Sequence, residues 1–225
     1  MGLFNENFTF LKLISRVFAS LVIIFFVTPL HEYAHAFAAY KLGDKTAFSQ
    51  GRLSPNPLKH IDIFGAISLL FFGYGWAKAV PVNTTNFKNK KTGLAITSAA
   101  GPIANFLMAL IGAIFLRIML LFYSTNSSFY DFVVLLFFEY IYLNISSAIF
   151  NLIPIPPLDG FGVMQCFFSE AATNIIYRYQ EFIKMALIVA VFTGILRVPM
   201  MKTVSALLHG IFHLVGVGTK FGIYI

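Results

Sequence analysis

Two histidines four residues apart, His31 and His35, have the spacing in this chain best suited to metal chemistry. On an α-helix they lie about one turn apart on the same face, so both imidazoles can reach one ion. Glu32 directly follows the first histidine. Zinc lowers the pKa of a bound water to about 7, and a carboxylate beside that water can act as its base. This combination is typical of zinc peptidases, although so short a pattern also occurs by chance.

A hydrolytic zinc site needs a third protein ligand and one position open to water. Asp159 stands before Gly160 and after three prolines in four positions, which forbid a regular helix and favour a fixed, turn-like segment. We therefore predict that Asp159 is the third ligand, and Glu139 is the alternative. The acidic residues from which it is chosen are Asp44, Asp62, Asp131, Glu139, Asp159, Glu170 and Glu181.

The composition identifies an integral membrane protein, because 58% of the 225 residues are apolar and only 11% are charged. No polar linker divides the chain, so we expect one membrane domain over residues 1–225, with a core at about 13–165 and C-terminal helices at about 182–218. The net charge of +7 does not indicate nucleic acid. Eight of the sixteen basic residues fall between Lys41 and Lys91, as on a cytoplasmic membrane face.

The single cysteine and the first residues limit the remaining possibilities. Cys166 excludes an internal disulfide and a cysteine zinc cage, and we expect it to be a small buried residue. Glu6 precedes Lys12 and Arg16, and no small-residue cleavage site follows. We therefore expect these residues to lead into the first span rather than to form a removable signal peptide.

Three segments are long and apolar enough to cross a bilayer: Leu13–Tyr40, Leu94–Phe122 and Phe132–Ile153. Pro29 is expected to kink the first of them just before the histidines. By the positive-inside rule, Lys41–Lys91 is cytoplasmic and the Ser124–Ser128 turn is external. The alternating direction of the spans then brings Asp159, after the third, to the membrane level of the two histidines.

The other apolar segments are shorter. Ile63–Phe72 is flanked by glycine and favours a re-entrant or sheet-like segment. Phe71–Val82 predicts a strand, a glycine turn and a second strand, with an interfacial aromatic anchor as the alternative. Phe182–Met201 and Val204–Gly218 leave four to six passages open. The predicted fold class is an all-α polytopic membrane protein with 4–6 transmembrane helices and a small membrane-embedded β-hairpin or sheet segment.

Several polar residues have two interpretations. His60 is either an outer-shell group of the metal site or an interfacial histidine. Glu139 is expected to be protonated or hydrogen-bonded to a neighbouring helix. His209 and His213 repeat the four-residue spacing without a glutamate and are expected to be structural. A path of amides inside the spans is expected to admit water, formed by Asn105, Asn144 and Asn151.

The His31–His35 motif in a membrane helix, together with Asn151–Gly160 ending in Leu-Asp-Gly, resembles the site-2 protease family of intramembrane zinc metalloproteases. The short form, without an added soluble domain, is the closest in pattern. The likeness covers most of residues 20 to 165. It extends through Gly51–Asp62, Gly75–Lys78 and Ala100–Pro102.

The resemblance implies roles for individual residues. One Zn²⁺ per chain would be bound by His31, His35 and Asp159, with Glu32 as general base. Asn151 would hold the substrate backbone or the oxyanion. The family's membrane-embedded sheet would correspond to about Phe64–Val82 and offer an edge to an unwound substrate strand. Ala79 stands where short members often have proline.

The sequence thus predicts a zinc endopeptidase that cleaves a transmembrane segment of another membrane protein near the cytoplasmic face. We expect a multi-pass protein of a bacterial or archaeal plasma membrane, whose partners are the lipid bilayer and the substrate. A helical substrate must first unwind, because its carbonyls are otherwise hydrogen-bonded. One alternative is a membrane zinc peptidase of another family with a glutamate ligand. The other is a metal or proton transporter or a helix-binding scaffold, which has no evident use for Glu32.

Overall fold

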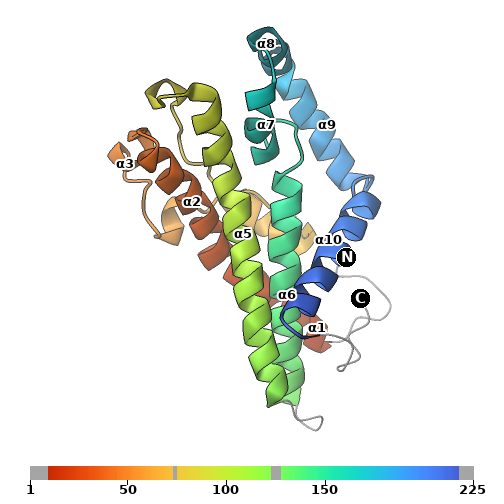
Figure 1. Ribbon diagram of the computed structural model, residues 1–225. Coiled ribbons are helices and arrows are strands. Elements are labelled where there is room, and N and C mark those ends of the chain that lie inside the picture. The colour runs from red at the N-terminus through yellow and green to blue at the C-terminus, as the bar shows by residue number, and fades with distance from the viewer. Residues whose placement is uncertain (1–9, 73–74, 123–127, 218–225) are drawn as a thin grey trace.

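The computed structural model of this chain describes residues 10–72, 75–122 and 128–217 (Figure 1). Over these ranges the regular structure is helical. The α-helices are α1 (Phe10–Val22), α2 (Thr28–Lys41), α3 (Thr46–Ser49), α4 (Ile63–Phe72), α5 (Lys90–Leu121), α6 (Ser128–Asn151), α7 (Asp159–Met164), α8 (Glu170–Arg178), α9 (Gln180–Phe192) and α10 (Arg197–Leu214). A π-helical turn, η1 (Ile23–Val27), joins α1 to α2, and the short 3₁₀ turns are η2 (Pro57–Lys59), η3 (Thr84–Asn86) and η4 (Gln165–Phe167).

Three helical segments are long and apolar enough to cross a membrane: Lys12–Lys41, Lys90–Leu121 and Phe129–Asn151. Helices α9 and α10 add a fourth only if they count as one span, because they are bent by 76° at the break between them. The described residues therefore supply three spans or, if the bent pair is one span, four, which is the lower limit of the predicted four to six. All three clear spans overlap the segments expected from the sequence.

The first span is one continuous helix with a wide turn in its middle. The Thr28 amide bonds to the Ile23 carbonyl, five residues back, and Pro29 follows within the first turn of α2. Proline has no N–H to offer the Phe25 carbonyl, so the regular hydrogen-bond ladder is interrupted here. The predicted disturbance at Pro29 therefore takes the form of a π-helical turn just before the histidines.

Helices α5 and α6 lie side by side through the middle of the molecule, and the α1–α2 helix runs obliquely past them (Figure 1). The α5–α6 contact is close at Gly112, where an added Cβ would lie 2.7 Å from the Tyr140 ring. Helix α10 packs onto the lower half of this pair. The core they share consists of Ala109, Ala113, Leu116, Leu120, Ile141, Ile145, Val204, Leu208, Phe212 and Val217.

The prediction of a β-hairpin or sheet segment is wrong for the described residues. Ile63–Phe72 forms helix α4, which the Asp62 carboxylate caps by accepting a hydrogen bond from the Gly65 amide at 2.9 Å. The residues after Gly75 are extended, but they form one antiparallel bridge, Ile61 with Ala77, and no strand. Gly73 and Tyr74, the predicted turn, lie outside the described residues.

The reason for the difference is that α4 and the extended segment cross rather than pair edge to edge. An added Cβ at Gly65 would lie 2.0 Å from the Trp76 carbonyl oxygen, so the extended chain crosses the helix at this glycine. The run Ile63–Phe72 also lacks the alternation of polar and apolar residues that marks a half-buried strand. At about 1.5 Å per residue, ten helical residues are too few to span the bilayer.

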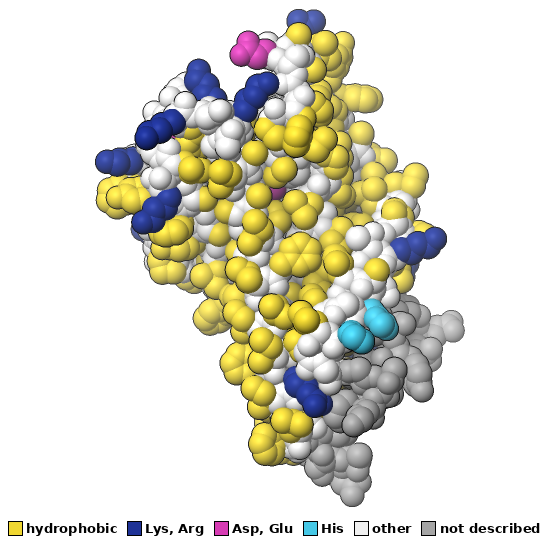
Figure 2. All heavy atoms as spheres, viewed as in Figure 1, with side chains coloured by type: hydrophobic (Ala, Val, Ile, Leu, Met, Phe, Trp, Pro, Cys, Tyr) yellow, Lys and Arg dark blue, Asp and Glu magenta, His cyan; other side chains and the backbone are white. Residues whose placement is uncertain are grey.

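The surface agrees with a membrane protein. Figure 2 shows hydrophobic side chains covering the body, while Lys and Arg side chains gather at the upper end. That end carries the connections on either side of α3, the start of α5 and the end of α6. The side of the membrane that this end faces remains a prediction, as does the external turn, of which residues 123–127 lie outside the described part of the chain.

Candidate active site

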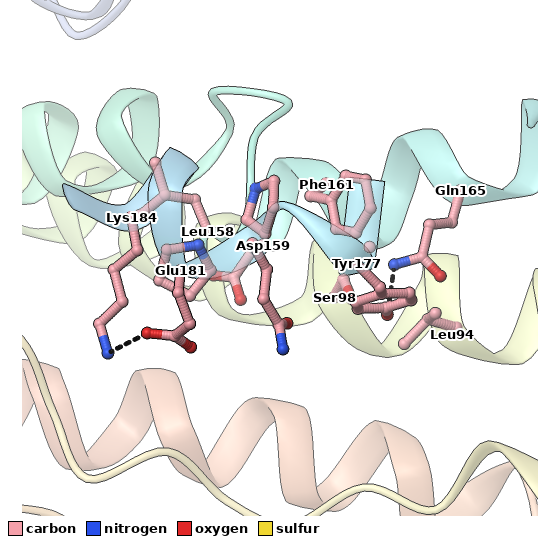
Figure 3. Close-up of a pocket in the computed structure, with 13 residues that line it drawn as sticks. Leu94, Ser98, Leu158, Asp159, Phe161, Gln165, Tyr177, Glu181 and Lys184 are labelled. Carbon is pink, nitrogen blue, oxygen red and sulfur yellow. Dashed lines mark hydrogen bonds and ion pairs between the residues drawn. The ribbon is translucent and has the colours of Figure 1, made fainter. Parts of the chain in front are cut away.

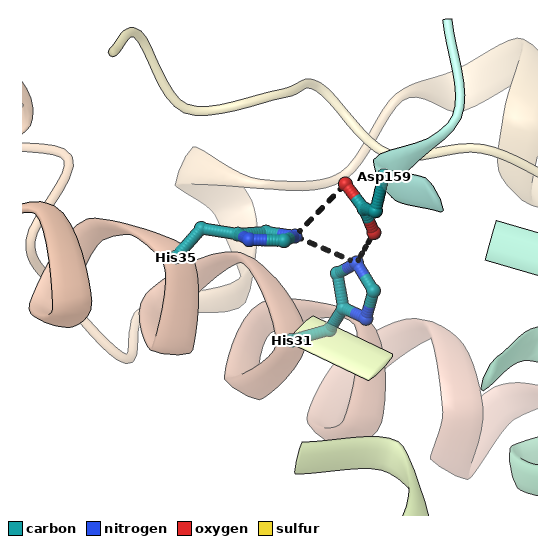
Figure 4. A group of neighbouring side chains, drawn as sticks. All are labelled: His31, His35 and Asp159. Carbon is teal, nitrogen blue, oxygen red and sulfur yellow. Dashed lines mark hydrogen bonds and ion pairs between the residues drawn. The ribbon is translucent and has the colours of Figure 1, made fainter. Parts of the chain in front are cut away.

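Three side chains from distant parts of the chain converge in the half of the molecule that carries the basic residues. The Nε2 atoms of His31 and His35 are 3.0 Å apart. The Asp159 carboxylate lies 3.3 Å from each, with Oδ2 nearest His31 and Oδ1 nearest His35 (Figure 4). Both histidines are buried, at 8% and 6% exposure. Among the described residues these three form a group whose ligand atoms all lie within 4.8 Å of one another.

This group fits zinc by donor type and by spacing. Two imidazole nitrogens and one carboxylate oxygen are the three protein ligands of a catalytic zinc site, which leaves a fourth position for water or substrate. Ligands at the usual zinc distances are about 3.3–3.5 Å apart along the edges of a tetrahedron. The 3.0 and 3.3 Å separations are close to that value.

The other ring nitrogen of each histidine is fixed by helix α5. His35 Nδ1 donates to the Thr97 carbonyl at 2.7 Å, and His31 Nδ1 lies 3.3 Å from Asn105 Oδ1. These contacts select the tautomer in which both Nε2 atoms are free to bind a metal. Asn105, which is expected to line a water path, lies against His31 of the candidate metal group, and the water path itself stays a prediction.

A glycine allows α5 to approach the histidines this closely. An added Cβ at Gly101 would lie 2.3 Å from His35 Nε2 and 2.6 Å from His31 Nε2. Since real Cβ atoms do not approach other atoms so closely, only glycine fits this position. Pro102 and Asn105 follow on the same helix and are buried. The Gly-Pro-x-x-Asn sequence of α5 thus lies directly against the two histidines.

Asp159 is the first residue of α7, at the end of the proline-rich turn. Gly160 lets this turn fold back on the end of α6, because an added Cβ would lie 2.2 Å from the Leu152 carbonyl oxygen. Gly162 makes the same kind of contact with α5, where a Cβ would lie 2.0 Å from Ser98 Oγ. These two close approaches hold Asp159 opposite the histidines, at the membrane level predicted from the order of the spans.

Glu32 lies beside the metal group on α2 and is 6% exposed. Its Oε2 accepts a hydrogen bond from the Val80 amide at 2.9 Å. A cavity of about 110 Å³ adjoins the carboxylate. Its lining includes Glu32, His35, Asp159 and three residues of the extended segment, Ala79, Val80 and Val82. The residues of the failed hairpin prediction therefore form one wall of the site.

A larger cavity of about 340 Å³ adjoins the first and shares Leu94, Ser98 and Asp159 with it. In Figure 3, Asp159 lies near its middle, Gln165 and Tyr177 toward one end, and Glu181 and Lys184 toward the other. The Gln165 amide donates to the Tyr177 hydroxyl at 2.9 Å. Together the two cavities border both the candidate metal group and the polar residues of α8 and α9.

The remaining predicted residues lie outside the metal group. Asn151 is the last residue of α6 and partly buried, and its role toward the oxyanion stays a prediction. Glu139, the alternative ligand, does not belong to the group of three, which favours Asp159. His209 and His213 are exposed on α10 (Figure 2). Cys166 is partly rather than fully buried.

His60 is buried in the connection between α3 and α4 rather than exposed at an interface. Its Nε2 donates to the Ser54 carbonyl at 2.7 Å. Burial, together with the positive charges of Arg52 and Lys59, lowers the pKa of His60 below its usual value. A neutral His60 therefore holds its own loop together and is not part of the metal group.

Comparison with known proteins identifies the family. Residues 117–195, which include Asp159, match the model of Peptidase family M50. "Putative zinc metalloprotease YwhC" of Bacillus subtilis is 40% identical over 157 residues, which cover 69% of this chain and 70% of the relative. No solved structure matches the chain.

More distant relatives carry a similar description. "Putative zinc metalloprotease Rip2" is 29% identical in Mycolicibacterium smegmatis and 30% identical in Mycobacterium tuberculosis, and this chain spans about half (52%) of their length. The identity to YwhC extends over more than two thirds of that protein. This membrane protein, with its His31, His35 and Asp159 group, therefore belongs to peptidase family M50, a site-2 protease family of zinc metalloproteases.

Proposed function

We propose that this zinc metalloprotease hydrolyses a peptide bond in or near a transmembrane segment of another membrane protein, close to the cytoplasmic face. The observation that carries the proposal is the position of the metal group. His31 and His35 belong to the first membrane span and are buried in it, near the end of the molecule where the basic residues gather. A substrate bond must reach that depth to meet them.

The chain's own residues supply the remaining chemistry. His31, His35 and Asp159 would hold the Zn²⁺, which would supply Lewis-acid polarisation of the scissile carbonyl and of a water molecule. Glu32 takes the proton from the attacking water at the carboxylate oxygen that does not accept from Val80, and later delivers it to the leaving amine. Asn151 donates an amide N–H to the oxyanion of the tetrahedral intermediate.

The cavities favour an extended substrate. A helix hides its carbonyls in hydrogen bonds, so the substrate must unwind near the scissile bond. An unwound chain that passes the metal group can continue into the larger cavity, since the two cavities share Asp159 and its neighbours. Gln165, Tyr177 and Gln180 in that cavity can bond to backbone groups that the unwound chain exposes.

We further propose that the protein resides in a bacterial or archaeal plasma membrane, with the basic end in the cytoplasm. The relatives reported above come from bacteria. Eight basic residues between Lys41 and Lys91 support this orientation by the positive-inside rule. The lipid bilayer and a membrane-protein substrate are the partners that follow.

The test is cleavage of a panel of tagged single-span membrane proteins in liposomes, with zinc content measured in every variant. We expect the wild type to cleave, and Glu32→Gln to keep its zinc but to lose at least about 100-fold in rate. Glu139→Gln is the matched control, an acid-to-amide change on α6 outside the metal group, and it should retain zinc and activity. Cleavage by Glu32→Gln at the wild-type rate would contradict the role of Glu32, and loss of zinc from Glu139→Gln would favour the glutamate-ligand alternative.

A further inference from the structure

We propose that Arg52 is a positioning residue for Glu32 and acts through the peptide group between Ala79 and Val80. The inference rests on the proposed function, because it takes Glu32 as the general base. Arg52 belongs to the connection between α3 and α4 and does not line either cavity described above. Its effect must therefore pass through the extended segment that lies between it and the site.

Hydrogen bonds connect the two residues. Arg52 Nη2 donates to the Lys78 carbonyl at 2.6 Å and to the Ala79 carbonyl at 3.3 Å. The amide of the following residue, Val80, donates to Glu32 Oε2 at 2.9 Å. The guanidinium and the carboxylate thus contact opposite sides of the same short stretch of backbone.

The geometry of the peptide bond makes this connection specific. The Ala79 C=O and the Val80 N–H belong to one planar trans unit, in which the two groups point in opposite directions. A guanidinium that holds the oxygen on one side therefore aims the N–H toward the other side, where Glu32 lies. Because Glu32 is only 6% exposed, its carboxylate is stabilised by a donor held in a fixed position.

The extended segment has few other supports near this peptide group. The Lys78 amide bonds to the His60 carbonyl at 2.9 Å, and the Asn83 amide bonds to Asp44 Oδ2 at 2.7 Å. Between these anchors no strand pairs with Ala79–Val82 within the described part of the chain. The orientation of the Ala79–Val80 peptide therefore depends on Arg52 and Glu32.

The backbone of Arg52 is itself fixed by hydrogen bonds and by the conformation of the preceding glycine. Its amide bonds to the Ala47 carbonyl at 2.8 Å. The preceding residue, Gly51, has a φ of 65°, which favours glycine, and its carbonyl accepts from Lys59 Nζ at 2.7 Å. Arginine suits this position because its guanidinium fork is planar and permanently charged, and one terminal nitrogen of the fork, Nη2, contacts both carbonyls.

The experiment uses the full-length protein in detergent or liposomes and compares Arg52→Ala and Arg52→Lys with Lys91→Met. Lys91 is the matched control, since its side chain also donates to a backbone carbonyl, that of Phe168 at 2.6 Å, which belongs neither to the α3–α4 connection nor to the extended segment. Amide hydrogen exchange at Val80, zinc content, kcat and KM are measured for each. Glu32→Ala gives the exchange rate of a Val80 amide without its acceptor.

We expect Arg52→Ala to keep its zinc, to lower kcat by roughly 10–100-fold and to leave KM within about twofold. Exchange at Val80 should rise toward the rate in Glu32→Ala. Arg52→Lys should recover part of kcat, because it keeps the charge without the fork. Lys91→Met should match the wild type in every measurement.

Two results would overturn the proposal. Unchanged exchange at Val80 in Arg52→Ala would show that the guanidinium does not hold this peptide group. A raised KM with an unchanged kcat would mean that the segment serves substrate binding and not Glu32. A failure of the proposed function is distinguishable, because the wild type would then cleave no protein of the panel, whereas the exchange comparison does not depend on catalysis.

Discussion

At the residue scale, the zinc affinity of the candidate site depends on the groups that bond to His31 and His35. His31 Nδ1 meets Asn105 Oδ1, and His35 Nδ1 meets a backbone carbonyl that no side-chain substitution can remove. The His31 contact is therefore the one that mutation can test. Such outer-shell contacts orient the ring and raise the basicity of the nitrogen that binds the metal.

We predict that Asn105→Ala weakens zinc binding by about 10–100-fold, as measured by competition with a chelator of known affinity. Asn105→Asp keeps an oxygen acceptor and should lose less. Asn144→Ala is the control, because Asn144 is also a fully buried amide in a span, but it donates to the Tyr140 carbonyl. Equal affinities of Asn105→Ala and the wild type would show that this contact does not hold His31.

Gly101 gives a second prediction at this scale. The methyl group of Gly101→Ala would lie 2.3 Å from His35 Nε2, so we expect loss of stoichiometric zinc even if the helices still assemble. Gly210→Ala is the matched control within helix α10, where nothing lies within 4 Å of the added Cβ, and it should be neutral or stabilise by up to about 1 kcal/mol. Zinc content and thermal melting of both variants check this.

Sequence reasoning reached His31, His35 and Asp159 because helical spacing and span order constrain them. It did not reach the contact of Asn105 with His31 or those of Arg52 with the extended segment. Asn105 contacts a histidine 74 residues away, and Arg52 contacts backbone atoms 26 residues away, so both depend on packing that no local pattern encodes. For Asn105, an amide four residues after Gly101 in an apolar span was the available signal.

At the element scale, the extended segment that walls the active site is anchored to the turn between α2 and α3. Asp44 is fully buried there, and its carboxylate accepts hydrogen bonds from the amides of Thr46 and Asn83 and from the Asn86 side chain. Burial opposes its ionisation, but these hydrogen bonds outweigh burial and hold the pKa of Asp44 below its usual value. The ionised carboxylate therefore anchors the end of the extended segment.

This lowered pKa makes the folding stability of the protein depend on pH. A carboxyl with a lower pKa in the folded state adds stability above its unfolded pKa, near 3.8, and that stability is lost as the pH falls through the folded value. We predict that Asp44→Asn is less stable than the wild type by about 1–3 kcal/mol at pH 7. The difference in melting temperature should narrow below about pH 4. A constant difference from pH 7 to pH 3 would contradict this account.

The failed hairpin prediction also belongs to this scale. The glycines near Ile63–Phe72 suggested a strand turn. Gly65 and Gly75 instead lie where the extended chain crosses helix α4, at a distance that leaves no room for a Cβ atom. Asp62 before an apolar run is a helix-start signal, and the structure uses it as a cap. Choosing between these interpretations required knowing that Trp76 packs on the helix, which is a tertiary contact.

At the scale of the whole molecule, the three long spans were predictable from their length and apolar composition. In lipid such segments can satisfy their backbone hydrogen bonds by forming transmembrane helices. The number of further passages was not, since α9 and α10 have 13 and 18 residues and meet at 76°. Their arrangement depends on α10 packing against α6. The orientation in the membrane rests on charge alone.

We predict that Lys88→Cys, in a Cys166→Ser background, reacts with a membrane-impermeant maleimide only after cells are opened. Lys88 is exposed at the basic end, two residues before α5 begins. Phe122→Cys, directly after the other end of α5, is the control and should react in intact cells. The reverse pattern would place the basic end, and with it the metal group, on the external side.

The π-helical turn at Ile23–Val27 has a further consequence for the first span. A π turn holds one more residue than an α turn, which offsets the rotational phase of the helix after it by about 100°. Before the turn, α1 faces α6, where Ala19 packs with Leu143; after it, α2 faces α5. One continuous transmembrane helix therefore changes neighbours halfway across the bilayer, so the residues that pack it against α6 and the histidines of the candidate metal group occupy different faces and can vary independently in sequence.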